Sequence, residues 1–282
     1  MVTVGFTQYL VERADVDWDS NSEACVDRSR RYRRIVGVGA SVCLLAPTST
    51  AVAQAPATVA IEVEAGPVWQ SRNDVQIPND ETGTRFSLVD LLGTGPQPAG
   101  RLYLTWNISR RHGVRALLAP LSYTEAGTLE ESVNFAGETY QPGTPVEGTY
   151  KFNSWRLGYR YRLVDRERLQ LLVGFTAKIR DAKVELRQGD TSSEKTDVGF
   201  VPLLHAAADW RFTHRWRLRF DFDGLAGGPG RAFDVALKVG YDLSDRWGIA
   251  AGYRTVEGGA DVESVYNFAW LHYAVGSVAY RF

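Results

Sequence analysis

His205 and Asp209 are residues whose types could support hydrolysis, because a histidine held by a carboxylate can act as a general base. They lie four positions apart in an alternating segment, which at about 3.3 Å per residue separates them by roughly 13 Å along a strand. That is too far for a direct hydrogen bond, so the pair would need a cross-strand partner such as Asp221. His272 is a further histidine, but Ser277 lies an odd number of positions away and faces the opposite side of the same strand.

Charged and apolar residues alternate along most of the chain. In 216–223 the even positions are Trp, Leu and Phe, and the odd positions are Arg and Asp; 231–243 repeats the pattern. This period predicts strands with one apolar and one polar face. We expect about ten strands, near 57–70, 99–109, 113–124, 148–163, 168–187, 196–212, 215–226, 231–243, 246–257 and 266–282.

The connections between these segments alternate in length. Short turns are expected at 110–112, 165–167, 213–214 and 244–245, and longer or glycine-rich loops at 71–98, 125–147, 188–195, 227–230 and 258–265. Such a rhythm is typical of outer-membrane barrels, with short periplasmic turns and longer outer loops. The segments 84–92 and 129–140 also alternate, so a twelve-stranded barrel stays open, as does an eight-stranded one. We interpret both segments as β-structure or a short helix within outer loops.

The last strand ends on Tyr280, Arg281 and Phe282. This ending resembles the C-terminal signature of bacterial outer-membrane β-barrel proteins, and the resemblance implies that Tyr280 and Phe282 form an assembly signal read by the barrel assembly machinery. With the alternation it predicts an all-β fold, a transmembrane antiparallel up-and-down β-barrel of about ten strands. A soluble β-sandwich could show the same alternation, but an N-terminal export signal, the terminal Phe282 and aromatic residues near the segment ends, taken together, favour the barrel.

The N-terminal part of the chain resembles an export signal. Five arginines lie between residues 28 and 34, an apolar run follows over 35–46, and small residues surround Ala53. We therefore divide the chain into an extension at 1–27, a signal peptide at 28–53 and the barrel at 54–282. Cys25 and Cys43 both precede the predicted cut, so the barrel would contain no disulfide and no cysteine metal site.

If the polar face of each strand points inward, charged side chains fill the interior of the barrel. A barrel of about ten strands is only slightly wider than the eight-stranded kind that side chains fill, so these residues predict a crosslinked plug. The alternative is a narrow passage selective for small anions or other small solutes. The predicted lumen residues are Glu62, Glu64, Arg101, Tyr103, Arg115, Arg156, Arg160, Arg162, Lys178, Arg180, His205, Asp209, Arg211, Arg217, Arg219, Asp221, Asp223, Asp234, Lys238, Asp242 and Arg254.

Composition narrows the function further. The formal net charge of −1 argues against nucleic acid as a partner, and no metal or cofactor motif is found. The expected partners are outer-membrane lipid and lipopolysaccharide. The chain also resembles omptin proteases in strand number and size, and their Asp pair and Asp–His pair would have His205 and Asp209 as nearest equivalents. We expect a structural or interaction protein, with a channel and a barrel-borne hydrolase (protease or lipid A-modifying) as alternatives. Its outer loops are acidic, with Asp74, Asp80, Glu81, Asp90, Glu125, Glu130, Glu131, Glu138, Glu257, Asp261 and Glu263.

Overall fold

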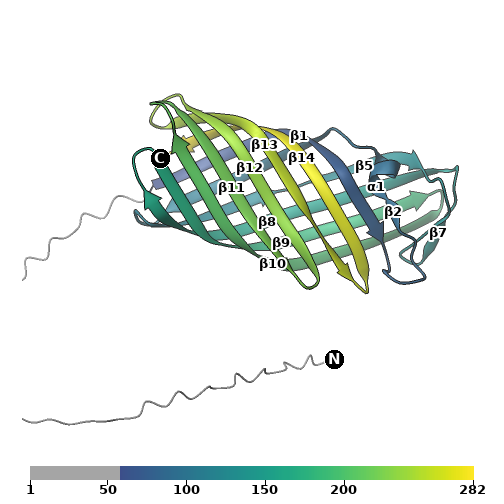
Figure 1. Ribbon diagram of the computed structural model, residues 1–282. Coiled ribbons are helices and arrows are strands. Elements are labelled where there is room, and N and C mark those ends of the chain that lie inside the picture. The colour runs from purple at the N-terminus through teal and green to yellow at the C-terminus, as the bar shows by residue number, and fades with distance from the viewer. Residues whose placement is uncertain (1–57) are drawn as a thin grey trace, which may run out of the picture. The chain divides into compact units, whose positions relative to one another are not determined.

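The alternating segments form ten long antiparallel strands within residues 58–282, the part of the chain described by the computed structural model. Each strand pairs with its neighbour in the sequence, and the last pairs with the first, which closes the barrel (Figure 1). The predicted extension, signal peptide and both cysteines lie outside the described residues. The barrel strands are β1 (Thr58–Gln76), β3 (Gln97–Asn107), β4 (His112–Ala119) continued by β5 (Ser122–Thr128), β8 (Pro145–Asp165), β9 (Leu169–Gln188), β10 (Thr191–Arg211), β11 (Trp216–Gly227), β12 (Gly230–Asp242), β13 (Trp247–Val262) and β14 (Val265–Arg281).

The barrel is apolar outside and charged inside over much of its height. On β12, Leu237 and Val239 face outward and are 49% and 44% exposed, whereas Asp234 and Lys238 face inward and are 3% and 6% exposed. A water-soluble sandwich would bury the opposite set, so the exposed apolar belt identifies a lipid-facing wall. Within the described residues no helix is long and apolar enough to span a bilayer.

The two ends of the barrel differ. The turn end carries the chain terminus and the short connections near 110, 166, 213 and 244, as predicted. The loop end carries the small elements β2 (Phe86–Ser87), α1 (Leu88–Leu92), β6 (Val133–Phe135) and β7 (Glu138–Tyr140) (Figure 1). The segments 84–92 and 129–140 are therefore loop structure, and the strand number is ten.

Two of the predicted long loops are wrong. β9 and β10 extend to Gln188 and Thr191, and Gly189 closes the tight turn between them with a φ of +58°. β13 and β14 likewise extend to Val262 and Val265. The added part of β10, residues 191–195, is polar on both faces, and the added part of β13, residues 258–262, consists mostly of small residues. Both therefore lack the alternation by which strands are recognised, but their backbone ladder still satisfies the hydrogen bonds.

The lumen is not polar throughout, which corrects the expectation of a continuous charge plug. At the loop end α1 and the β6–β7 hairpin pack with inward side chains of β8 and β9 to form an apolar core. Phe135, Tyr140, Val146 and Leu186 are fully buried in it. The inward side chains are thus charged in the half nearer the turn end and largely apolar near the loop end.

The contact between α1 and β5 gives a testable prediction. A Cβ atom added to Gly127 would lie 1.9 Å from the carbonyl oxygen of Leu91 in α1, whereas one added to Gly228 would meet nothing within 4 Å. Gly127→Ala should displace α1 and lower the free energy of unfolding by about 1–3 kcal/mol. Urea unfolding in lipid vesicles, followed by tryptophan fluorescence, measures this. Gly228→Ala is the matched control, and equal midpoints for the two variants would contradict the packing described.

Candidate functional site

The centre of the lumen is organised around Asp234 on β12. One of its carboxylate oxygens accepts hydrogen bonds from Arg101 at 3.0 Å and from Arg156 at 2.7 Å, and the other accepts one from Arg254. Arg254 also donates to Glu64 at 3.0 Å. These five side chains come from five different strands, so the network ties opposite walls of the barrel together.

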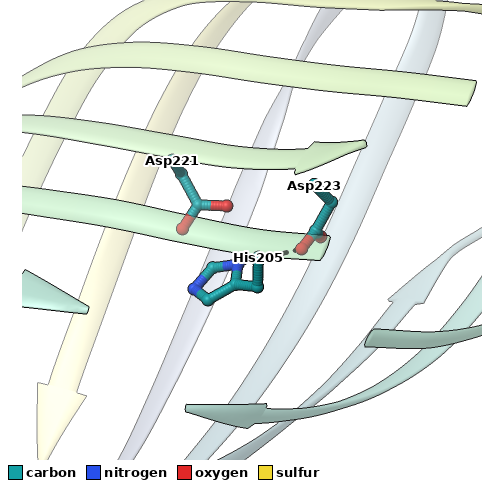
Figure 2. Close-up of side chains that lie close together, drawn as sticks. All are labelled: His205, Asp221 and Asp223. Atoms are coloured by element: carbon teal, nitrogen blue, oxygen red, sulfur yellow. Dashed lines mark hydrogen bonds and ion pairs between the residues drawn. The ribbon is translucent and has the colours of Figure 1, made fainter. Parts of the chain in front are cut away.

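A second cluster lies beside it and contains the histidine singled out in the sequence (Figure 2). His205 Nδ1 lies 2.9 Å from Asp223 Oδ1, and its partner is therefore Asp223, its direct neighbour on β11, and not Asp209. Asp221 completes a group whose ligand atoms lie within 4.8 Å of one another. Arg115 binds both oxygens of Asp221, at 2.7 and 3.0 Å.

This second cluster is poorly suited to a metal ion or to hydrolysis. The two Asp223 oxygens already accept hydrogen bonds from Thr176, His205 and Arg156, so a cation would have to displace an arginine. His205 is 3% exposed, and its Nε2 atom has no hydrogen-bond partner among residues 58–282. A substrate could not reach it without opening the lumen.

Ion pairs continue from this centre to the turn end. Lys238 binds Glu62 and Glu64, both at 2.7 Å. Arg219 lies within 3.5 Å of both Glu62 and Asp209. Arg217 binds Asp209 at 3.2 Å and also contacts Asp242, while Arg211 stands at the mouth, 41% exposed and 4.0 Å from the same carboxylate. A cavity of about 220 Å³ opens here.

Some predicted lumen cations stand apart from this network. Arg180 pairs with Asp197 on the neighbouring strand. Lys178 is buried and Arg160 is partly buried, and within the described residues neither has a carboxylate within ion-pair distance. The Lys178 ammonium lies instead 4.7 Å from the ring centre of Phe152.

Lys178 lines a second, larger cavity of about 560 Å³ towards the loop end. The walls are mostly apolar and include Phe152, Phe200, Leu203 and Leu271, and its floor includes Arg156 and Asp234 from the central network. The alternation pattern gave no signal for this outer cavity, because inward-facing apolar residues interrupt the pattern that marks the lumen.

The outer cavity lies beside a break in the barrel wall. The ladder between β10 and β11 begins at the pair Leu204 and Gly224, so among the described residues 191–203 of β10 pair only with β9. Val201, Pro202 and Leu203 on this edge line the cavity, together with residues of the β11–β12 hairpin. The cavity is therefore bordered by an open strand edge as well as by the loop end.

Comparisons with known proteins agree with the architecture. No family model matches the chain, and no curated protein does. Among solved structures the outer membrane protease OmpT from Escherichia coli matches with a TM-score of 0.54 at 8% identity, covering 83% of this chain and 99% of that chain. Ail from Yersinia pestis, in complex with sucrose octasulfate, gives 0.39 at 10% identity over 80% and 99%, and Neisserial surface protein A gives 0.35 at 12% over 79% and 97%.

The shared fold and the exposed apolar belt identify the class of membrane protein. This chain is an outer-membrane β-barrel protein. In the outer-membrane barrel the turn end faces the periplasm and the loop end faces the cell exterior. The terminal residues Tyr280 and Phe282 lie at the periplasmic edge, with ring centres 4.8 Å apart, and Trp247 packs on Tyr280 at 4.7 Å.

The outer wall of the barrel holds a contact that the sequence did not predict. His272 faces lipid as expected, and Ser277 is buried in the lumen, but the hydroxyl of Ser71 lies 2.7 Å from His272 Nε2. Ser71 comes from β1, about 200 positions away, and it keeps the outward face of the odd-numbered residues before it, such as Val63. The β-bulge between Gln70 and Arg72 moves Arg72 to the same outer face. Neither the pairing of β1 with β14 in this register nor the bulge can be seen in the period-two pattern.

The central network predicts that Asp234 holds the barrel together. Asp234→Asn removes the charge that three buried arginines share, and leaving buried charges unpaired costs about 3–5 kcal/mol. Its urea midpoint in lipid vesicles should fall far below that of Asp190→Asn, a matched change in the exposed turn between β9 and β10. Adding Arg254→Gln to Asp234→Asn should restore part of the loss. Equal midpoints for the two single variants would contradict the role given to Asp234.

Proposed function

We propose that this outer-membrane barrel has an interaction role, binding an amphipathic small molecule with an anionic head in its outer cavity. The observation that carries the proposal is Lys178, a buried cation on the wall of an otherwise mostly apolar space. Ligand sites combine apolar walls with a few placed polar groups in this way.

The charge on Lys178 determines the kind of head group. The neighbouring Arg156 has its two Nη atoms on Asp223 and Asp234, whereas Lys178 lies against the ring of Phe152 and has no carboxylate within ion-pair distance among the described residues. Because a buried charge without a partner is costly, an anionic ligand group would be bound there. The apolar side chains above Lys178 would contact the ligand's hydrocarbon part.

The open edge of β10 gives such a ligand an entry route. Outward-facing Val198 and Phe200 on this edge are 70% and 64% exposed, so the wall is apolar outside as well as inside. A molecule dissolved in the outer leaflet could pass between β10 and the β11–β12 hairpin. Molecules in water could enter at the loop end.

The channel alternative is less well supported. The periplasmic and outer cavities lie on either side of the central network, where two small spaces of about 10 Å³ each are found. Such a space holds about one water molecule. A continuous path would require the network of Asp234 and Glu64 to open.

The acidic outer loops would add an interaction surface for cations or for lipopolysaccharide. Asp80, Glu81, Glu130 and Glu131 are exposed, and hydrogen bonds from the hydroxyl and backbone N–H of Thr82 lower the pKa of Asp80. Not every predicted acid is free, because Asp74 pairs with Arg72 and Glu257 pairs with Arg231.

The proposal predicts that Lys178 sets affinity for the anionic head. A dansyl-labelled undecanoic acid should bind the refolded barrel and brighten, and Lys178→Gln should weaken binding about tenfold or more, because a hydrogen bond to a charged group contributes about 1.5–3 kcal/mol. The dansyl alcohol of equal length should bind both proteins alike. Arg166→Gln, in a periplasmic turn, is the control. Unchanged affinity of Lys178→Gln for the acid would refute the proposal.

A further inference from the structure

We propose that Ser71, His272 and Tyr253 form an esterase site on the lipid-facing wall, which cleaves an acyl ester of a phosphorylated lipid in the outer leaflet. The site is separate from the outer cavity, because all three side chains face outward from β1, β14 and β13. The esterase proposal can therefore be tested independently of ligand binding at Lys178.

The three side chains form a chain of hydrogen bonds. His272 Nε2 lies 2.7 Å from the Ser71 hydroxyl, and His272 Nδ1 lies 2.5 Å from the Tyr253 hydroxyl. The Tyr253 ring stacks on the imidazole with ring centres 6.1 Å apart. A serine on a histidine that is oriented by a further group is the arrangement of an activated nucleophile.

A β-bulge lies at this site. Gln70 pairs with Leu271 and Arg72 pairs with Trp270, so Ser71 is the extra residue of β1. Ser71 keeps the outward face of the odd-numbered residues before it, and the bulge turns Arg72 outward beside it. Bulges often re-aim a side chain beside an active site, at some cost to the ladder.

The height of the site matches the ester groups of a lipid. Tyr280 marks the periplasmic aromatic belt on β14, and Trp270 lies ten positions further along the strand. At about 3.3 Å per residue and a tilt near 40°, this is roughly 25 Å, the height of the apolar band. Trp270 packs on His272 with ring centres 5.3 Å apart, so the histidine lies at the outer interface, where lipid esters and water meet.

A basic shelf lies next to the site on the side of the cell exterior. Three arginines surround two aromatic rings: the guanidinium of Arg85 lies 3.7 Å from the ring centre of Tyr266, and those of Arg231 and Arg72 lie 4.8 and 5.7 Å from that of Phe268. Asp74 and Glu257 neutralise Arg72 and Arg231. Arg85 has no ion pair among the described residues, so the shelf keeps one positive charge for a phosphate.

The reaction follows from these positions. The Ser71 oxygen attacks the ester carbonyl carbon while its proton passes to His272 Nε2. The tetrahedral intermediate collapses, the bond to the lipid alcohol breaks, and His272 returns the proton to the leaving oxygen. Water then attacks the acyl-serine with His272 again taking the proton, which releases a fatty acid and restores the serine. Tyr253 is a positioning residue.

The test uses the full chain refolded in detergent micelles, with heat-dependent gel migration as the folding check for each variant. Phosphatidylglycerol, lipopolysaccharide and phosphatidylcholine are offered separately, and released fatty acid is measured by mass spectrometry. We expect release from at least one of the two anionic lipids, and the better of them identifies the source of the phosphate. Ser71→Ala and His272→Gln should each lower the rate at least 100-fold. Ser264→Ala, in the β13–β14 turn, should leave the rate unchanged.

Two further variants test the assigned roles. Tyr253→Phe should keep part of the activity and shift its pH profile, because the phenol orients His272 without touching substrate. Arg85→Gln should slow phosphatidylglycerol or lipopolysaccharide cleavage several-fold and leave phosphatidylcholine cleavage unchanged. A fluorophosphonate should label Ser71 in the wild type and not in His272→Gln. No release from any of the three lipids, or full activity in folded Ser71→Ala, would overturn the proposal.

Discussion

The rest of this barrel depends on the pairing of buried charges across its lumen. Asp234 meets three arginines from three other strands, and Glu64 meets Arg254 and Lys238. Burying any one of these charges without a partner in so narrow a lumen would lower the stability of the fold. Paired with one another, they hold the strands of the wall in one register. The network also divides the interior, because it leaves a small periplasmic cavity on one side and a large outer cavity on the other. The two sites that we propose lie accordingly at the outer end of the lumen and on the outer wall.

Much of this architecture could be predicted from the sequence. Period-two alternation located the ten strands because lipid and a charged lumen impose opposite demands on the two faces of each strand. Phe282 and the interface aromatic residues favoured a barrel with its apolar face outward over a soluble sandwich. The expected lumen charges mostly face one another. The partner of each charge could not be predicted from the sequence, because a pair such as His205 and Asp223 depends on the register between two strands. Sliding one strand by two residues leaves the alternation unchanged.

The features missed are those that interrupt the alternation. The outer core needs α1 and the β6–β7 hairpin folded back into the lumen, and short polar-apolar segments carry no signal for that. The open edge of β10 is marked only by Pro202, which lacks the N–H that a ladder would use. The bulge at Ser71 moves Arg72 to the outer face, and the pairing of β1 with β14 places Ser71 beside a histidine far along the chain. Such features lie where the alternation of polar and apolar residues is interrupted, so the structure is needed to locate them.

The most direct test of the sealed lumen is thiol labelling from one side of the membrane. With Cys25 and Cys43 replaced by serine, Val201→Cys places a thiol in the outer cavity and Thr105→Cys places one in the periplasmic cavity. In intact cells a small membrane-impermeant thiol reagent should label Val201→Cys quickly and leave Thr105→Cys unlabelled until the cells are opened. Labelling of Thr105→Cys from outside at a comparable rate would show a continuous path through the barrel and contradict the account.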